Sequence, residues 1–172
     1  EAFLDSVFHT EMPMSAQEQK ESFHEALAEA LGTDCSMDVA QAIHSQLSQL
    51  IEDHKQRKDP EPLKVTAKDI TRILEDCQVP QEQVTAFQEL CGEHFGEGAA
   101  MDPANLIDPG KVEIKTPQVS VTVDPECSYL VESRIIDGQK YLLIPAGEGV
   151  EFNGLAVRIP YENQTELSEN NT

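Results

Sequence analysis

The chain has 172 residues, of which 39% are hydrophobic and 26% charged, a balance typical of a globular protein rather than a disordered one. Its 32 acidic residues outnumber its 12 basic residues and give a formal net charge of −20. Such a charge repels phosphate backbones, whose binding depends on Lys and Arg displacing counterions. Nucleic acid is therefore disfavoured as a partner. We interpret the acidic side chains as a solvated surface, with the docking of a basic partner as the alternative.

The cysteine pattern and the ends of the chain bear on its compartment. The four cysteines are scattered without a Cys-x-x-Cys pair, which favours reduced thiols in a cytoplasmic protein. No apolar run approaches the roughly 20 residues of a membrane span, and no basic-then-apolar leader opens the chain. Because Glu1-Ala-Phe-Leu resembles the middle of a helix, we expect a piece of a longer protein.

The N-terminal part of the chain predicts helices. Residues 2–9 resemble a helix end, and Ser15-Ala-Gln-Glu18 has the spacing of a capping box for the next helix. Gly32 stands where a C-cap glycine belongs. A third helix is predicted from about Ser36 to Lys58, and Asp59-Pro-Glu-Pro ends this helical segment.

Two shorter helices are predicted next. Thr66 caps a helix from Ala67 to Cys77, and Pro80 opens the following one. The pair resembles a helix-turn-helix DNA reader in length, but its second helix presents no Lys or Arg to phosphates or guanines. Gln78 also stands where the tight turn usually has glycine. We interpret the pair as a packed helical hairpin and keep nucleic-acid association as a disfavoured alternative.

An antiparallel sheet is predicted in the last third of the chain by Asp137-Gly138 and Asn153-Gly154. These dipeptides tolerate the positive φ angles of a type I′ hairpin turn. The second turn pairs Phe152 with Leu155 on an apolar face. The first hairpin has apolar residues on both faces, so we expect it at the centre of the sheet. Leu63-Lys-Val is expected to add an edge strand.

These elements predict an α+β protein, with N-terminal helices and a helical hairpin packed on a small antiparallel sheet built from the two tight hairpins. The predicted domains are a helical segment over residues 1–60, an α+β domain over residues 61–160, and a disordered acidic tail over residues 161–172.

No chemical motif is complete. His24-Glu25 begins like a zinc protease signature, but the second histidine is replaced by Ala28. Cys91 and His94 could form a nucleophile pair, yet Cys91 lies on an apolar helix stripe, where a buried inert thiol is expected. The sequence therefore predicts no catalytic, metal-binding or cofactor-binding residue and no cofactor.

Four stretches of the sequence stand out as motifs: Val65-Thr-Ala-Lys-Asp-Ile, Lys115-Thr-Pro-Gln-Val-Ser-Val, Leu130-Val-Glu-Ser-Arg-Ile-Ile-Asp-Gly-Gln-Lys-Tyr-Leu-Leu-Ile-Pro-Ala and Glu151-Phe-Asn-Gly-Leu. Through them the chain resembles DUF4317, a family of uncharacterised proteins of Gram-positive anaerobes. The resemblance runs from Leu63 to Ile159 and implies the C-terminal portion of a longer bacterial protein. It implies no activity and no catalytic residue.

The leading functional hypothesis is a non-catalytic cytoplasmic structural or protein-interaction module of a larger protein, because fold-specifying signals occur without a convergent polar motif. Tyr129, Arg134 and Tyr141 are the predicted contact residues. The partner is another protein or a missing part of the same chain, not nucleic acid or a membrane; the oligomeric state is left open. The alternative is an enzyme or ligand-binding domain whose site a missing N-terminal region completes.

Overall fold

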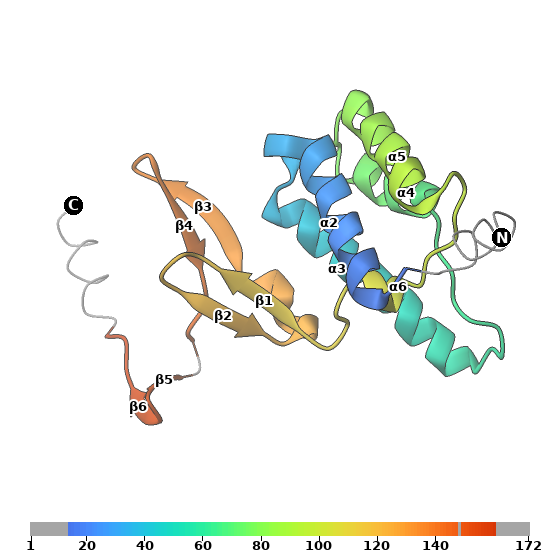
Figure 1. The fold of residues 1–172 in the computed structure, drawn as a ribbon. Coiled ribbons are helices and arrows are strands. Elements are labelled where there is room, and N and C mark those ends of the chain that lie inside the picture. Colours follow the sequence, from blue (N-terminus) through green and yellow to red (C-terminus); the bar gives the residue numbers. More distant parts are fainter. Residues whose placement is uncertain (1–13, 148, 161–172) are drawn as a thin grey trace, which may run out of the picture. The chain divides into compact units, whose positions relative to one another are not determined.

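The computed structural model describes residues 14–147 and 149–160. The helix end predicted over residues 2–9 and the tail predicted over residues 161–172 lie outside these ranges. The chain divides into two compact units, residues 1–129 and residues 130–172. Helices and one hairpin make up the described part of the first unit, and two further hairpins that of the second (Figure 1). The predicted α+β class is confirmed.

Local capping signals set where the helices of the first unit begin. At the predicted capping box, Glu18 N donates to Ser15 Oγ at 3.1 Å and Ser15 N donates to Glu18 Oε2 at 2.8 Å. Thr66 N likewise donates to Asp69 Oδ2 at 2.8 Å. The helices are α2 (Ala16–Leu31), α3 (Met37–Arg57), α4 (Ala67–Asp76), α5 (Gln81–Phe95) and the short α6 (Pro103–Leu106).

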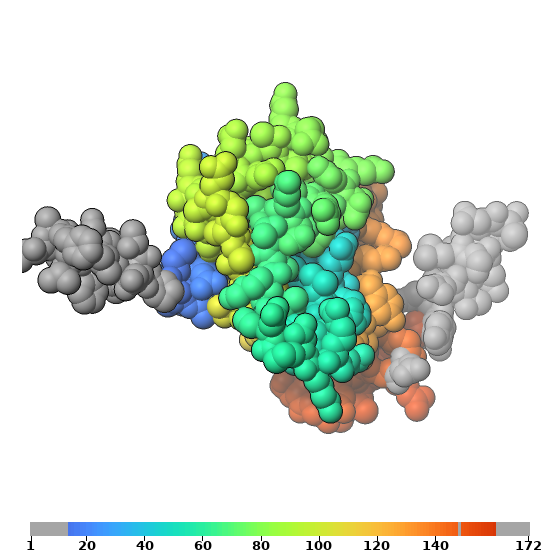
Figure 2. Space-filling view, turned by 90° about the vertical axis from the view of Figure 1, so that its right-hand side faces the viewer, coloured from blue at the N-terminus to red at the C-terminus, as the bar shows by residue number. Residues whose placement is uncertain are grey.

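One apolar core holds these helices together. Phe23 of α2 meets Phe87 of α5 edge to face with ring centroids 6.1 Å apart, and neither ring is more than 1% exposed. Leu47 of α3 and Leu74 of α4 are also fully buried in this core. Figure 2 shows the surfaces of α3 (teal), α4 and α5 (green) adjoining on one face of the unit. Residues on both sides of position 60 build this one core, and the division into two compact units falls after residue 129.

The strands form three separate two-stranded antiparallel sheets in the described residues. They are β1 (Val112–Lys115) with β2 (Ser120–Val123) in the first unit, then β3 (Glu132–Ile136) with β4 (Gln139–Leu143) and β5 (Val150–Phe152) with β6 (Leu155–Val157) in the second. The expectation that the β3–β4 hairpin lies at the centre of a larger sheet is wrong, because neither strand pairs with a third strand in the described residues. The expected edge strand at Leu63–Val65 is reduced to one antiparallel bridge between Val65 and Met101.

Both predicted hairpin turns form. Asp137 and Gly138 have φ angles of 51° and 79°, and Asn153 and Gly154 have φ angles of 51° and 83°. Positive φ at both central residues is the mark of a type I′ turn. Phe152 pairs with Leu155, and Val150 with Val157, in the predicted register.

Candidate functional site

The structure brings together two of the three predicted contact residues. Arg134 of β3 and Tyr141 of β4 are direct cross-strand partners, so their side chains share one face of the hairpin. The Arg134 guanidinium lies 3.0 Å from the Glu132 carboxylate. The Tyr141 hydroxyl donates to Gln139 Oε1 at 3.3 Å. Tyr129 is 72% exposed and belongs to the other unit. The contact role of these residues stays a prediction.

Most of the exposed large apolar side chains lie in the same unit as the Arg134–Tyr141 pair, and our choice of contact residues included only Tyr141 among them. Eleven large hydrophobic residues are exposed in the described part of the chain, and nine of them lie in residues 130–160. We call these nine the apolar hairpin surface: Leu130, Ile135, Ile136, Tyr141, Leu142, Ile144, Phe152, Leu155 and Ile159. The signal that could have found them was the presence of apolar residues on both faces of the first hairpin.

Each hairpin of the second unit leaves apolar side chains open to solvent. On β3–β4, Ile135 is 73% exposed on one face, while Ile136 is 43% exposed on the other. On β5–β6, the cross-strand pair Phe152 and Leu155 is 68% and 67% exposed. An isolated two-stranded hairpin is marginally stable in water, and contiguous exposed apolar patches mark interaction sites. The second unit therefore exposes large apolar side chains on both of its hairpins.

The two units also differ in their content of charged residues. Residues 1–129 contain 25 of the 32 acidic residues and 9 of the 12 basic ones, whereas residues 130–160 contain four acidic and three basic residues. The apolar hairpin surface thus belongs to a nearly neutral stretch of a strongly acidic chain.

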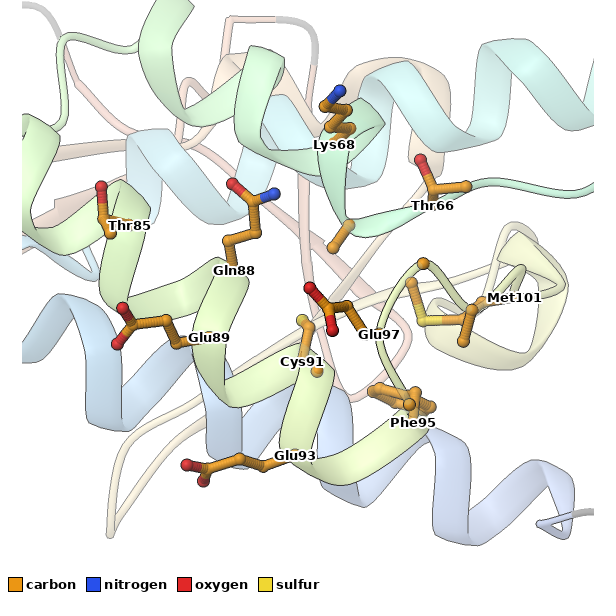
Figure 3. A pocket seen from close by; sticks show the side chains of 15 residues that line it. Thr66, Lys68, Thr85, Gln88, Glu89, Cys91, Glu93, Phe95, Glu97 and Met101 are labelled. Atoms are coloured by element: carbon orange, nitrogen blue, oxygen red, sulfur yellow. The ribbon is translucent and has the colours of Figure 1, made fainter. Parts of the chain in front are cut away.

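A pocket of about 740 Å³ lies in the first unit, between the start of α4, α5 and the loop after α5. Figure 3 shows Glu89 and Glu93 extending away from Glu97, and all three carboxylates belong to exposed residues. A catalytic carboxylate pair needs burial or close coupling to separate its two pKa values. These solvated side chains have neither feature. His94 does not line this pocket.

Cys91, which lines the same pocket, is a buried thiol. Its residue is 2% exposed, and burial raises the pKa of the thiol to about 12. The nucleophilic thiolate is therefore scarce at neutral pH, which confirms the interpretation of Cys91 as a buried thiol.

Burial, with a smaller contribution from the charge of Lys20, lowers the pKa of His24. Within residues 14–147 and 149–160, no three His, Cys, Asp or Glu side chains gather closely enough to hold a metal ion.

The helical hairpin of α4 and α5 keeps a tight turn without glycine. Gln78 adopts the left-handed conformation itself, with a φ of 64°. The exposed positions of α5 include Glu82, Gln88 and Glu89, which offer no positive charge to a phosphate backbone. No helix in the described ranges has the length and apolar character needed to cross a membrane.

The fold defines the class of this protein: an α+β protein with a helical core and hairpins that expose apolar side chains. The chain matches the family model described as a domain of unknown function, DUF4317, over residues 1–155 of 172. It therefore belongs to the DUF4317 family. The match includes α2 and α3, so it begins well before the Leu63 limit of the sequence motifs. No curated protein and no solved structure matches the chain.

Proposed function

We propose that this chain is a non-catalytic, cytoplasmic protein-interaction module that binds its partner through the apolar hairpin surface. One observation carries the proposal: nine of the eleven exposed large hydrophobic residues in the described chain fall in residues 130–160. In the described part of that stretch only Val131 is a buried hydrophobic residue. A folded domain normally buries such side chains, and each one gains about 1.5–3 kcal/mol when it leaves water completely.

The hairpin geometry supports a recognition role. The strands β3, β4, β5 and β6 already have fixed turns and registers, so their apolar side chains are held in place before a partner arrives. A preorganised surface loses less conformational entropy on binding than a flexible one does. A partner would in turn supply the apolar contacts that an isolated hairpin lacks.

Two further features support the non-catalytic and cytoplasmic parts of the proposal. The buried Cys91 thiol has a pKa raised to about 12, which disfavours nucleophilic chemistry at neutral pH. All four cysteines are free, as is usual where the cytosol keeps thiols reduced.

Photo-crosslinking in cells tests the proposal. A photoreactive amino acid at Ile135 should capture a discrete protein partner, whereas the same group at Gln88, exposed on α5, should not. Phe152→Glu should abolish the capture at Ile135, while Gln88→Glu should leave it intact. Helical circular dichroism of each variant confirms that the first unit is folded. Equal capture from both positions, or capture indifferent to Phe152→Glu, would show that the hairpins are not the binding surface.

A further inference from the structure

Strand β4 has an open edge in the part of the chain that the structure describes. In the described residues β4 pairs only with β3, and its five positions contain neither proline nor a bulge. The two-residue turn makes Ile136 and Gln139 a hydrogen-bonded pair, and such pairs alternate along an antiparallel ladder. The backbone N–H and C=O groups of Lys140 and Leu142 therefore point away from β3. They are aligned to accept another strand.

We propose that the occupant of this edge is a second copy of the chain, whose β4 pairs antiparallel with β4 about a two-fold axis at Tyr141. This inference rests on the proposed function, because it assigns a partner to strand β4, which carries Tyr141 and Leu142 of the apolar hairpin surface.

The register at Tyr141 uses the whole strand. Tyr141 lies opposite Tyr141 of the second copy as a non-hydrogen-bonded pair, the closer of the two pair types. Lys140 lies opposite Leu142 of the second copy, and their outward backbone groups form the flanking hydrogen-bonded pairs. Gln139 lies opposite Leu143 of the second copy. Aromatic cross-strand pairs stabilise antiparallel sheets, so the two-fold axis falls on the residue best suited to it.

Charge favours β4 over β3 for this pairing. The equivalent full-length register on β3 is centred on Arg134 and sets two guanidinium groups directly opposite each other. Like charges in that position destabilise a sheet. On β4 the only charged residue is Lys140, and an apolar Leu142 faces it. With four acidic and three basic residues in positions 130–160, the hairpins are also where two copies of this acidic chain repel each other least.

The two-fold pairing closes the assembly. It yields a four-stranded sheet in the order β3–β4–β4–β3, which passes the three-strand minimum for a sheet with independent stability. The outer edges are then the two β3 strands, which carry Glu132 and Arg134. Charged side chains on an edge strand oppose further strand addition. A dimer rather than a fibre is the expected product.

Proline substitution separates the two edges. Ser133 and Leu142 are cross-strand partners in a non-hydrogen-bonded pair, so the N–H of each points out of the hairpin, toward opposite edges. Leu142→Pro removes the outward donor from β4 and Ser133→Pro removes it from β3, without breaking a hydrogen bond of the hairpin. In sedimentation equilibrium of the full chain, Leu142→Pro should raise the dimer Kd by about tenfold or more, since symmetry removes two hydrogen bonds. Wild type and Ser133→Pro should remain dimeric.

Cysteine crosslinking fixes the register. Opposed residues of a non-hydrogen-bonded pair have Cα atoms about 4.5 Å apart, within the span of a disulfide. With the accessible native cysteines replaced by serine, Tyr141→Cys should oxidise to a covalent dimer and Gln139→Cys should not. A monomer at all concentrations, or a dimer indifferent to Leu142→Pro, would overturn the second-copy inference. A monomer that is crosslinked at Ile135 to a different protein overturns it as well, yet leaves the proposed function standing.

Discussion

The two units of this protein use apolar side chains in opposite ways. In the first unit Phe23 and Phe87 are no more than 1% exposed and pack against each other. In the second, Phe152 and Leu155 form a cross-strand pair that is about two-thirds exposed. The first unit carries most of the acidic residues, and the hairpins are nearly neutral. The helical unit buries its large apolar side chains against one another, while the hairpins leave most of theirs open to solvent.

Truncation of one aromatic ring in each unit gives the largest expected contrast. Phe87→Ala removes a fully buried ring and should lower the free energy of unfolding by about 3–5 kcal/mol. Phe152→Ala removes an exposed ring and should change it by no more than about 0.5 kcal/mol. Urea unfolding followed by helical circular dichroism measures both. Similar losses in the two variants would show that the hairpins share the stability of the helical core.

The Asp137-Gly138 turn offers a way to weaken one hairpin alone. Gly138 has a φ of +79°, and a Cβ there meets no atom within 4 Å, so Gly138→Ala costs conformational energy without a clash. The hairpin should lose roughly 1–2 kcal/mol. Hydrogen exchange should accelerate in β3 and β4 and stay unchanged in α5. Gly147→Ala, in the same unit and without a positive φ, is the matched control and should have little effect. Faster hydrogen exchange in α5 would contradict this prediction, because it would show that the stability of α5 depends on the β3–β4 hairpin.

A gain in stability is expected at the turn between α4 and α5. Gln78→Gly should raise the free energy of unfolding of the first unit by about 0.5–1 kcal/mol, because glycine adopts the left-handed φ of 64° without the Cβ penalty. The same substitution at Gln88, exposed in the middle of α5, should lower it by about 1 kcal/mol. Chemical denaturation measures both, and a loss at Gln78 would mean that its side chain stabilises the turn.

The last expected effect is confined to alkaline solution and concerns the pH dependence of the helical unit. Burial raises the pKa of the Cys91 thiol from 9.0 to about 12, so an unfolded chain loses this proton at lower pH than the folded chain does. The stabilisation is complete below pH 9.0 and is lost as the pH rises toward about 12. Over that window wild type should lose stability more steeply than Cys91→Ala in urea titrations. Parallel pH profiles would contradict the burial of this thiol.

Local features of this protein follow from its sequence because they depend on residues a few positions apart. The Ser15–Glu18 capping box starts α2, and both type I′ turns form at the expected dipeptides. The turn at Asp137-Gly138 also fixes the β3–β4 register, and with it the pairing of Arg134 with Tyr141. Gln78 shows the limit of such local rules, since the turn forms there without the glycine expected by analogy.

The tertiary structure alone decided which apolar residues are buried. Alternating apolar residues look the same in a strand beneath a helix and in a strand exposed to water, so the pattern could not show that the hairpins form separate sheets. The division after residue 129 depends on contacts between helices far apart in the chain, such as α2 and α5. Sequence set the short-range geometry through backbone sterics and capping, and long-range packing determined which apolar residues remained exposed.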